Sequence, residues 1–285
     1  MDIIQALTDE LQVQRWQVEA AVKLIDEGNT IPFISRYRKE ATGSLNDEVL
    51  RRLLYLRNLE DKKAQVLSSI EEQGKLTEEL KNAILAAQTL VVVEDLYRPY
   101  RPKRRTRATV AKEKGLEPLA NIILLQMTEQ PLEIEAEPFV SEEKGVADVK
   151  EALAGAQDIL AEAISDEADY RIYIRKMTVK SGTLASSAKK EGEESVYEMY
   201  YDFEEPVSKI AGHRVLALNR GEKEKILTVK INAPEEEILK WLKRQVIKKE
   251  NPNTSPILEA AVEDSYKRLI APAIEREIRS DLTEK

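Results

Sequence analysis

The chain has 285 residues and a formal net charge of −8, and it contains no cysteine. Apolar residues make up 42% and charged residues 34%, which is typical of a folded, water-soluble protein and excludes an intrinsically disordered one. The lack of cysteine excludes disulfides and thiolate metal sites, and no apolar stretch approaches the ~20 residues that a membrane span needs. We therefore expect a cytoplasmic protein with no membrane partner.

Helical periodicity predicts that most of the first half of the chain is α-helical. The expected helices cover 2–11, 15–27, 31–42, 46–73 and 78–88, with one or two more in 110–127, broken near Pro118. Ser44 and Asp47 should form a capping box at the start of the long helix, which Gly74 should end. Thr77 should cap the helix that follows. Residues 90–93 suit either a short strand or the tail of a helix.

The second half is also expected to be helical, with one β element. A helical pattern runs over 146–177 and should stop by Gly182, and Gly155 within it indicates a closely packed neighbour. Residues 183–195 are expected to be mobile, and the aromatic-rich residues 196–206 suit a short helix.

The strongest β signal lies at 226–231, where ILTVKI has strand composition. Residues 215–220 either pair with it as a hairpin or form a helix that stops at Gly221. Two more helices should begin at Pro234 and Ser255, the last one kinked or interrupted at Pro272. The predicted fold is mostly α, with one small β hairpin or strand near 215–232 and a long C-terminal helix.

An acidic, proline-bearing segment at 129–148 is interpreted as a connector between subdomains. The predicted organisation is an N-terminal helical subdomain at 1–128 with a basic loop at 97–107, the connector at 129–148, a second helical subdomain at 149–253 that carries the β element, and the start of a long central helix at 254–285.

The basic loop at 97–107 is the most informative segment. It carries six basic side chains, two tyrosines, two prolines and no acid, within an acidic chain. Arginine and lysine suit phosphate oxygens, tyrosine offers a face for base stacking, and the prolines predict an extended loop. The predicted nucleic-acid-binding residues here are Tyr97, Arg98, Tyr100, Arg101, Lys103, Arg104, Arg105 and Arg107. Two alternatives remain: a solvated loop, or a loop that docks on an acidic face of the chain itself.

A second basic patch lies in the ISRYRKE segment. Arg36 and Lys39 are spaced i, i+3 and should share one helix face, beside Tyr37, so both are candidate nucleic-acid contacts. The alternative is an intrahelical pair between Arg36 and Glu40, which are spaced i, i+4. The two tryptophans, Trp16 and Trp241, are interpreted as packing residues.

No catalytic motif occurs in the sequence. GxGxxG, P-loop, GxSxG and HExxH patterns are all missing, and the single histidine, His213, is interpreted as structural or capping. Glu94 and Asp95 could hold Mg²⁺, but an adjacent acid pair more often marks a helix end or a partner for nearby arginines. We therefore expect a protein that is not an enzyme, with no catalytic residue, metal site, cofactor or small-molecule substrate.

Three phrases carry a family resemblance: residues 29–43, residues 94–107 and residues 212–222, with residues 115–120 and 154–161 fitting between them. Together they resemble the N-terminal region of the Tex family of bacterial transcription accessory proteins, over essentially the whole chain. The sequence departs from the family where Ala211-Gly212 replaces a common Pro-Ser, which affects local helix capping.

The resemblance implies a longer protein that binds nucleic acid and acts in transcription. Members continue into a YqgF-like domain with an RNase-H-like fold, helix-hairpin-helix elements and an OB-fold RNA-binding domain, so this chain is expected to be an N-terminal fragment with helix-turn-helix-like elements. The expected partners are RNA or DNA, through phosphate contacts, and the transcription machinery. The alternative is a protein-interaction scaffold whose basic loop makes interdomain or partner contacts, with nucleic-acid binding in the OB-fold domain.

Overall fold

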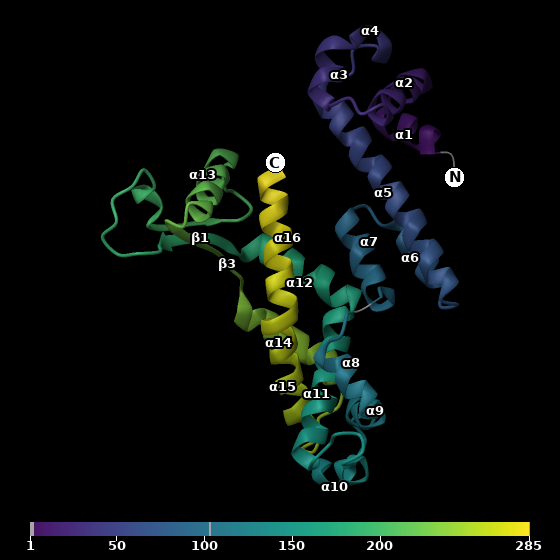
Figure 1. Ribbon diagram of the computed structural model, residues 1–285, viewed down its shortest axis with the longest axis vertical. Helices are drawn as coiled ribbons and strands as arrows, with labels where there is room; N and C mark the ends of the chain where they lie inside the picture. The colour runs from purple at the N-terminus through teal and green to yellow at the C-terminus, as the bar shows by residue number, and fades with distance from the viewer. Residues whose placement is uncertain (1–2, 103, 285) are drawn as a thin grey trace. The chain divides into compact units, whose positions relative to one another are not determined.

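Helices dominate the computed structural model, which describes residues 3–102 and 104–284 (Figure 1). Three strands within that part of the chain form one small antiparallel sheet, and the C-terminal helical segment is long. The predicted mostly α fold is therefore confirmed. No helix in the described ranges is both long and apolar enough to cross a bilayer. The chain divides into two units, Met1–Tyr97 and Arg98–Lys285.

The first unit is built on one long helix. Its elements are α1 (Ile3–Leu11), α2 (Arg15–Asp26), α3 (Ile31–Tyr37), α4 (Lys39–Thr42), α5 (Asp47–Glu72), α6 (Glu78–Ala86) and α7 (Leu90–Tyr97). Helix α5 buries Leu50, Leu53 and Ile70 on one stripe, against which α1, α3, α6 and α7 pack. Thr77 caps α6 as predicted, since its side-chain oxygen accepts a hydrogen bond from the Leu80 N–H at 3.1 Å.

Local signals misplaced two boundaries in this unit. The single helix expected over 31–42 is two helices, because Arg38, at φ −125° and ψ 34°, leaves helical geometry between α3 and α4. The predicted cap Ser44 lies in a left-handed turn at φ 65°, two residues before the N-cap position of α5. Asn46 takes that role and accepts a hydrogen bond from the Val49 N–H at 2.9 Å. Residues 90–93 are helical.

The second unit is organised around α11. Its helices are α8 (Arg107–Glu113), α9 (Glu117–Leu125), α10 (Leu132–Ala136), α11 (Val149–Asp166), α12 (Ala168–Ser181), α13 (Gly212–Lys223), α14 (Glu235–Val246), α15 (Ser255–Asp264) and α16 (Ala271–Glu284). Helices α8, α9, α10 and α15 all pack on α11, which buries a row of small and branched side chains that includes Ala152, Ala156 and Leu160. The break that was expected near Pro118 lies just before it, at Gly115.

The segment 129–148, which was expected to be a connector, lies within the second unit. Its apolar residues Leu132, Ala136 and Val146 are buried in the same core as α11. The structure instead divides the chain between Tyr97 and Arg98. The acidic composition of this segment suggested a linker. Its apolar residues are nevertheless buried in the core, and the free energy gained by burying their surface holds the segment in the second unit.

The sheet has the order β2-β1-β3, with strands β1 (Thr183–Ala188), β2 (Asp202–Pro206) and β3 (Leu227–Asn232). The central strand lies where a mobile segment was expected. Its consecutive residues Ala185 and Ser186 are both buried, so both faces of the strand are covered there, which suits small side chains. The VLALNR segment belongs to helix α13, so the hairpin alternative is wrong. At the start of α13, Ala211 provides no side-chain cap, as the departure from the family pattern indicated.

The C-terminal helical segment is interrupted by a π-helical stretch at Ser265–Ile270, between α15 and α16. Pro272 explains its position, because proline has no N–H to donate to the carbonyl one turn earlier and its ring crowds that carbonyl. A wider π turn accommodates both effects. The predicted interruption of this helix is thus confirmed, although it lies before the proline.

A substitution at Gly155 measures how tightly α11 packs against its neighbours. A Cβ at this position would overlap the Leu116 side chain and lie 3.3 Å from the Ala111 Cβ. A glycine-to-alanine change inside a helix normally stabilises by about 0.5–1 kcal/mol. Here we expect Gly155→Ala to lower the free energy of unfolding by about 1–2 kcal/mol, because Leu116 is itself buried and overpacking forces it to move. Urea unfolding of the two proteins measures the sign, and a gain in stability would contradict this packing.

Candidate nucleic-acid interface

The basic loop joins the two units and is less extended than predicted. Tyr97 is the last residue of α7, Arg98–Tyr100 form a 3₁₀ turn, and Arg107 already belongs to α8. Residues 101–102 and 104–106 belong to no helix or strand, and Lys103 lies outside the described residues. Thr106 sets the end of the loop: its Oγ1 accepts a hydrogen bond from the Thr109 N–H at 3.1 Å, and the Thr106 N–H donates to Thr109 Oγ1 at 2.7 Å.

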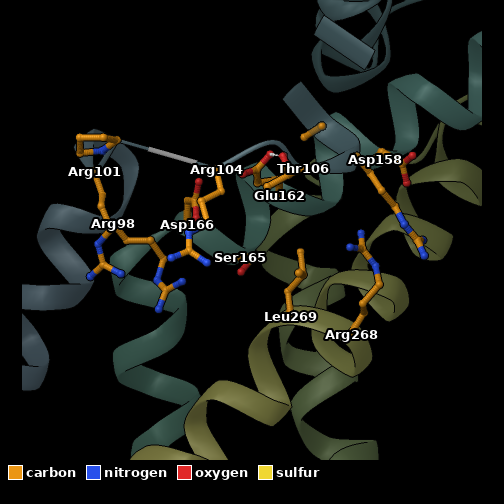
Figure 2. A pocket seen from close by; sticks show the side chains of 13 residues that line it. Arg98, Arg101, Arg104, Thr106, Asp158, Glu162, Ser165, Asp166, Arg268 and Leu269 are labelled. Carbon is orange, nitrogen blue, oxygen red and sulfur yellow. Dashed lines mark hydrogen bonds between the residues drawn. The ribbon is translucent and has the colours of Figure 1, made fainter. Parts of the chain in front are cut away.

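A pocket of about 550 Å³ lies between this loop, α8, α11 and the π-helical stretch, all within the second unit (Figure 2). Its charged lining consists of five arginines and three carboxylates: Arg98, Arg101, Arg104, Arg107 and Arg268, with Asp158, Glu162 and Asp166. Figure 2 shows Arg98, Arg101 and Arg104 grouped at one side near Asp166, and Asp158 above Arg268 at the other.

One wall of the pocket is the acidic face of α11. Asp158, Glu162 and Asp166 are spaced i, i+4 and therefore follow one line along the helix. Glu162 Oε2 accepts a hydrogen bond from Thr106 Oγ1 at 3.2 Å, which ties the end of the loop to α11. Burial raises the pKa of the Asp158 carboxyl, while the nearby Arg107 and Arg268 guanidiniums act in the opposite direction.

The arginines differ in how far their charge is already compensated. Arg268 forms a bidentate ion pair with Asp264: its Nε and Nη2 donate hydrogen bonds to the two carboxylate oxygens at 3.0 and 2.9 Å. Arg105 reaches Glu113 at 3.7 Å, but both groups are exposed, so this pair is worth little. Arg104 and Arg107 are exposed and form no ion pair within the described part of the chain. The half-buried Arg98 keeps a buried Nε that has no hydrogen-bond partner among the described residues.

The two tyrosines of the loop are less available than the arginines. Tyr97 packs in the first unit, where its hydroxyl lies 3.0 Å from Ser69 Oγ and the Lys62 ammonium lies 5.8 Å from its ring centre. Tyr100 is half-buried in the 3₁₀ turn. Both positions favour packing over base stacking.

The second basic patch lies in the first unit, on α3 and α4. Arg36 and Lys39 are exposed, and neither forms an ion pair in the described residues. The intrahelical pair considered for Arg36 is not formed, because Arg38 takes Glu40 instead, at 3.3 Å.

The remaining candidates are the acid pair at 94–95 and the two tryptophans. Glu94 pairs with Lys62 at 2.8 Å, and Asp95 is buried within α7. The ranges that the structure describes contain no cluster of carboxylates and histidine able to hold a metal ion. Trp241 packs as predicted, stacked on Tyr173 with ring centres 4.0 Å apart, whereas Trp16 is 52% exposed.

Sequence reasoning missed the residues that build the pocket behind the loop. Arg268 and the acidic row on α11 line this pocket and were not singled out, and neither was Arg171, which is buried at the start of α12. The i, i+4 spacing of the three acids was a usable signal for an acidic helix face. No pattern in the neighbouring sequence indicated that this face lies beside the loop.

These features define a helix-rich protein whose second unit carries an arginine-lined pocket. A family model described as Tex central region-like matches residues 127–285, and one described as Tex-like protein N-terminal domain matches residues 1–71. The chain belongs to the Tex family of transcription accessory proteins. The resemblance read from residues 29–43, 94–107 and 212–222 is confirmed.

Three relatives show the extent of the likeness. The chain is 49% identical over 288 residues to Uncharacterized protein YdcI of Bacillus subtilis, with 99% of this chain and 40% of that protein aligned. It is 43% identical over 235 residues to Transcriptional accessory protein Tex of Neisseria gonorrhoeae, covering 80% and 31%. It is 32% identical over 302 residues to S1 RNA-binding domain-containing protein 1 of Homo sapiens, covering 99% and 30%. The chain thus spans well under half the length of these relatives.

Proposed function

We infer that this chain is a nucleic-acid-contacting part of a transcription accessory factor, acting in the cytoplasm without catalysing a reaction. Family membership supports the transcription role, and one relative bears the name of a transcriptional accessory protein, another that of an S1 RNA-binding domain protein. The helix-turn-helix-like elements implied by the family and contact with the transcription machinery remain predictions.

The observation that carries the proposal is the state of Arg104 and Arg107. Both guanidiniums are exposed beside a pocket and form no ion pair in the described residues, although the chain as a whole is acidic. A phosphate backbone supplies closely spaced anions to such groups. In this reading Arg98, Arg101, Lys103, Arg104, Arg105 and Arg107 contact phosphates, and Arg36 and Lys39 form a second contact region.

The test is binding of a labelled single-stranded RNA, and then of duplex DNA, across a salt series. Each phosphate contact should steepen the log–log salt slope by about 0.7 on single strands and about 0.9 on duplex. We expect a variant with Arg104, Arg105 and Arg107 changed to alanine to flatten the slope by about two to three units. A control that changes Lys189, Lys190 and Lys209 to alanine removes the same charge from other exposed positions and should leave the slope nearly unchanged.

Equal slopes for the wild type and the arginine variant would assign the loop to a protein or interdomain contact, which is the scaffold alternative. Cleavage of either nucleic acid by the chain with Mg²⁺ would contradict the non-catalytic part of the proposal.

A further inference from the structure

Two exposed aromatic rings stand side by side on α3 in the first unit. Tyr37 is 67% exposed and Phe33 41% exposed, and their ring centres lie 5.4 Å apart with a 46° angle between the planes. Single exposed apolar residues are ordinary, but a pair of adjacent large rings on a short helix leaves substantial apolar surface in water. The tilt means that Phe33 does not stack flat on Tyr37, so the face of the tyrosine is not covered by it.

The same helix face carries uncompensated positive charge. Phe33, Arg36 and Tyr37 are spaced i, i+3 and i+4, so they share an arc of the helix surface. Lys39 follows at the start of α4. Arg36 and Lys39 form no ion pair in the described residues, whereas Arg38 between them pairs with Glu40. Aromatic faces beside cations are the chemistry that proteins use to hold unpaired nucleotides.

The backbone under these rings is well anchored. Ile34, the residue after Phe33 on α3, is fully buried, and Thr30 caps the helix by accepting a hydrogen bond from the Phe33 N–H at 3.3 Å. On the far side of α4, Gln17 Nε2 donates to the Thr42 carbonyl oxygen at 3.1 Å. Because the backbone is fixed, only the side-chain torsions of the rings lose freedom when a ligand stacks on them.

We propose that the α3–α4 surface, with Tyr37 and Phe33 as its platform and Arg36 and Lys39 as its phosphate contacts, binds unpaired bases of a single-stranded nucleic acid. The proposal rests on the proposed function and adds a second site, with a stated ligand class. Duplexes keep their bases stacked internally and offer no free face to Tyr37, so the site prefers single strands. A protein partner is the less favoured occupant, because an apolar interface gains nothing from the two unpaired cations beside the rings.

The test compares a short oligouridine strand with the same strand lacking its bases, using the full chain and a salt series. Changing Tyr37 to leucine keeps an apolar side chain but removes the π face. We expect this change to weaken oligouridine binding about tenfold, within the roughly five- to 150-fold range for one stacked base, and to leave the salt slope unchanged. Binding of the abasic strand should not change. Tyr37→Trp restores a ring and should bind oligouridine at least as well as the wild type.

The outcomes separate this site from the loop. If the wild type binds and the loop-arginine variant flattens the slope, but Tyr37→Leu binds oligouridine normally, the platform is overturned, the surface belongs to a protein contact, and the proposed function stands. Equal weakening of the normal and abasic strands would also overturn it, because the ring would then act through packing. If the wild type binds neither strand, both proposals fail. Because Tyr37 is mostly exposed, the thermal unfolding of the variants should match the wild type.

Discussion

Replacing Arg171 with alanine should lower the free energy of unfolding of the second unit by about 3–5 kcal/mol. Arg171 is fully buried at the start of α12. Its Nε donates to the Ser165 carbonyl oxygen, and its Nη2 donates to Ser165 Oγ at 2.7 Å. Alanine would leave a cavity and would also leave two buried acceptors on Ser165 without these donors. Because Ser165 and Asp166 line the arginine pocket, the corner between α11 and α12 should loosen as well.

Urea unfolding followed by tryptophan fluorescence measures this loss. The chain has two tryptophans, and changing the exposed Trp16 to phenylalanine leaves Trp241, in the second unit, as the reporter. The matched control is Lys176→Ala in the same helix, where an exposed side chain should cost no more than about 0.5 kcal/mol. A loss below about 1 kcal/mol for Arg171→Ala would show that its burial and hydrogen bonds are not what hold the corner.

Changing Gln126 to alanine should cost about 3 kcal/mol, because one side chain serves three backbone groups from a distant segment. Gln126 Nε2 donates to the Val246 carbonyl oxygen at 3.0 Å, and Oε1 accepts hydrogen bonds from the Lys248 and Lys249 N–H groups at 3.0 and 3.2 Å. Gln126 is buried directly after the end of α9. Its side chain supplies the hydrogen bonds that these backbone groups would otherwise have to form with water. Its loss should detach the end of α14 from α9.

A glycine substitution at position 126 distinguishes the contribution of the side-chain hydrogen bonds to stability from the cost of backbone strain. Gln126 has φ 57°, a left-handed conformation that glycine adopts without cost. Gln126→Gly loses the same side-chain hydrogen bonds but relieves this strain, so it should be about 1 kcal/mol more stable than Gln126→Ala. Both variants are measured in the Trp241 reporter background. Two variants as stable as the wild type would show that the Gln126 bridge is replaced by solvent.

The helix boundaries that the sequence predicted well are those with a complete local signal. Thr77 followed by acids begins α6, and Gly74 ends the long helix α5, because capping and left-handed glycines act within one turn of chain. The boundary at Arg38 and the strand β1 were not predictable in this way. Thr183–Ala188 is a strand because β2 and β3 pair with it on both sides, and those partners lie far along the chain.

The candidate site likewise has one part that the sequence predicted and one part that it did not. The density of arginine in 97–107 is visible without a structure, and so is the basic patch of Arg36 and Lys39 beside Tyr37, since both depend only on residues close in sequence. The acidic wall was not predictable as part of the site. Asp158 and Glu162 meet the loop because α8 packs on α11, and this packing includes the close approach of Gly155 to Ala111 of α8.

The sequence by itself determined a mostly helical, cysteine-free protein of the Tex family with two basic, tyrosine-bearing segments. Composition, periodicity and the short sequence motifs of the family are all properties of short stretches of chain, so they can be recognised without a structure. Only the tertiary structure decided that residues 129–148 belong to the core of the second unit, that three strands form a sheet, and that Arg104 and Arg107 stay exposed beside a pocket while Tyr97 is packed away. Those outcomes depend on burial of apolar surface between segments distant in sequence, which no local pattern encodes.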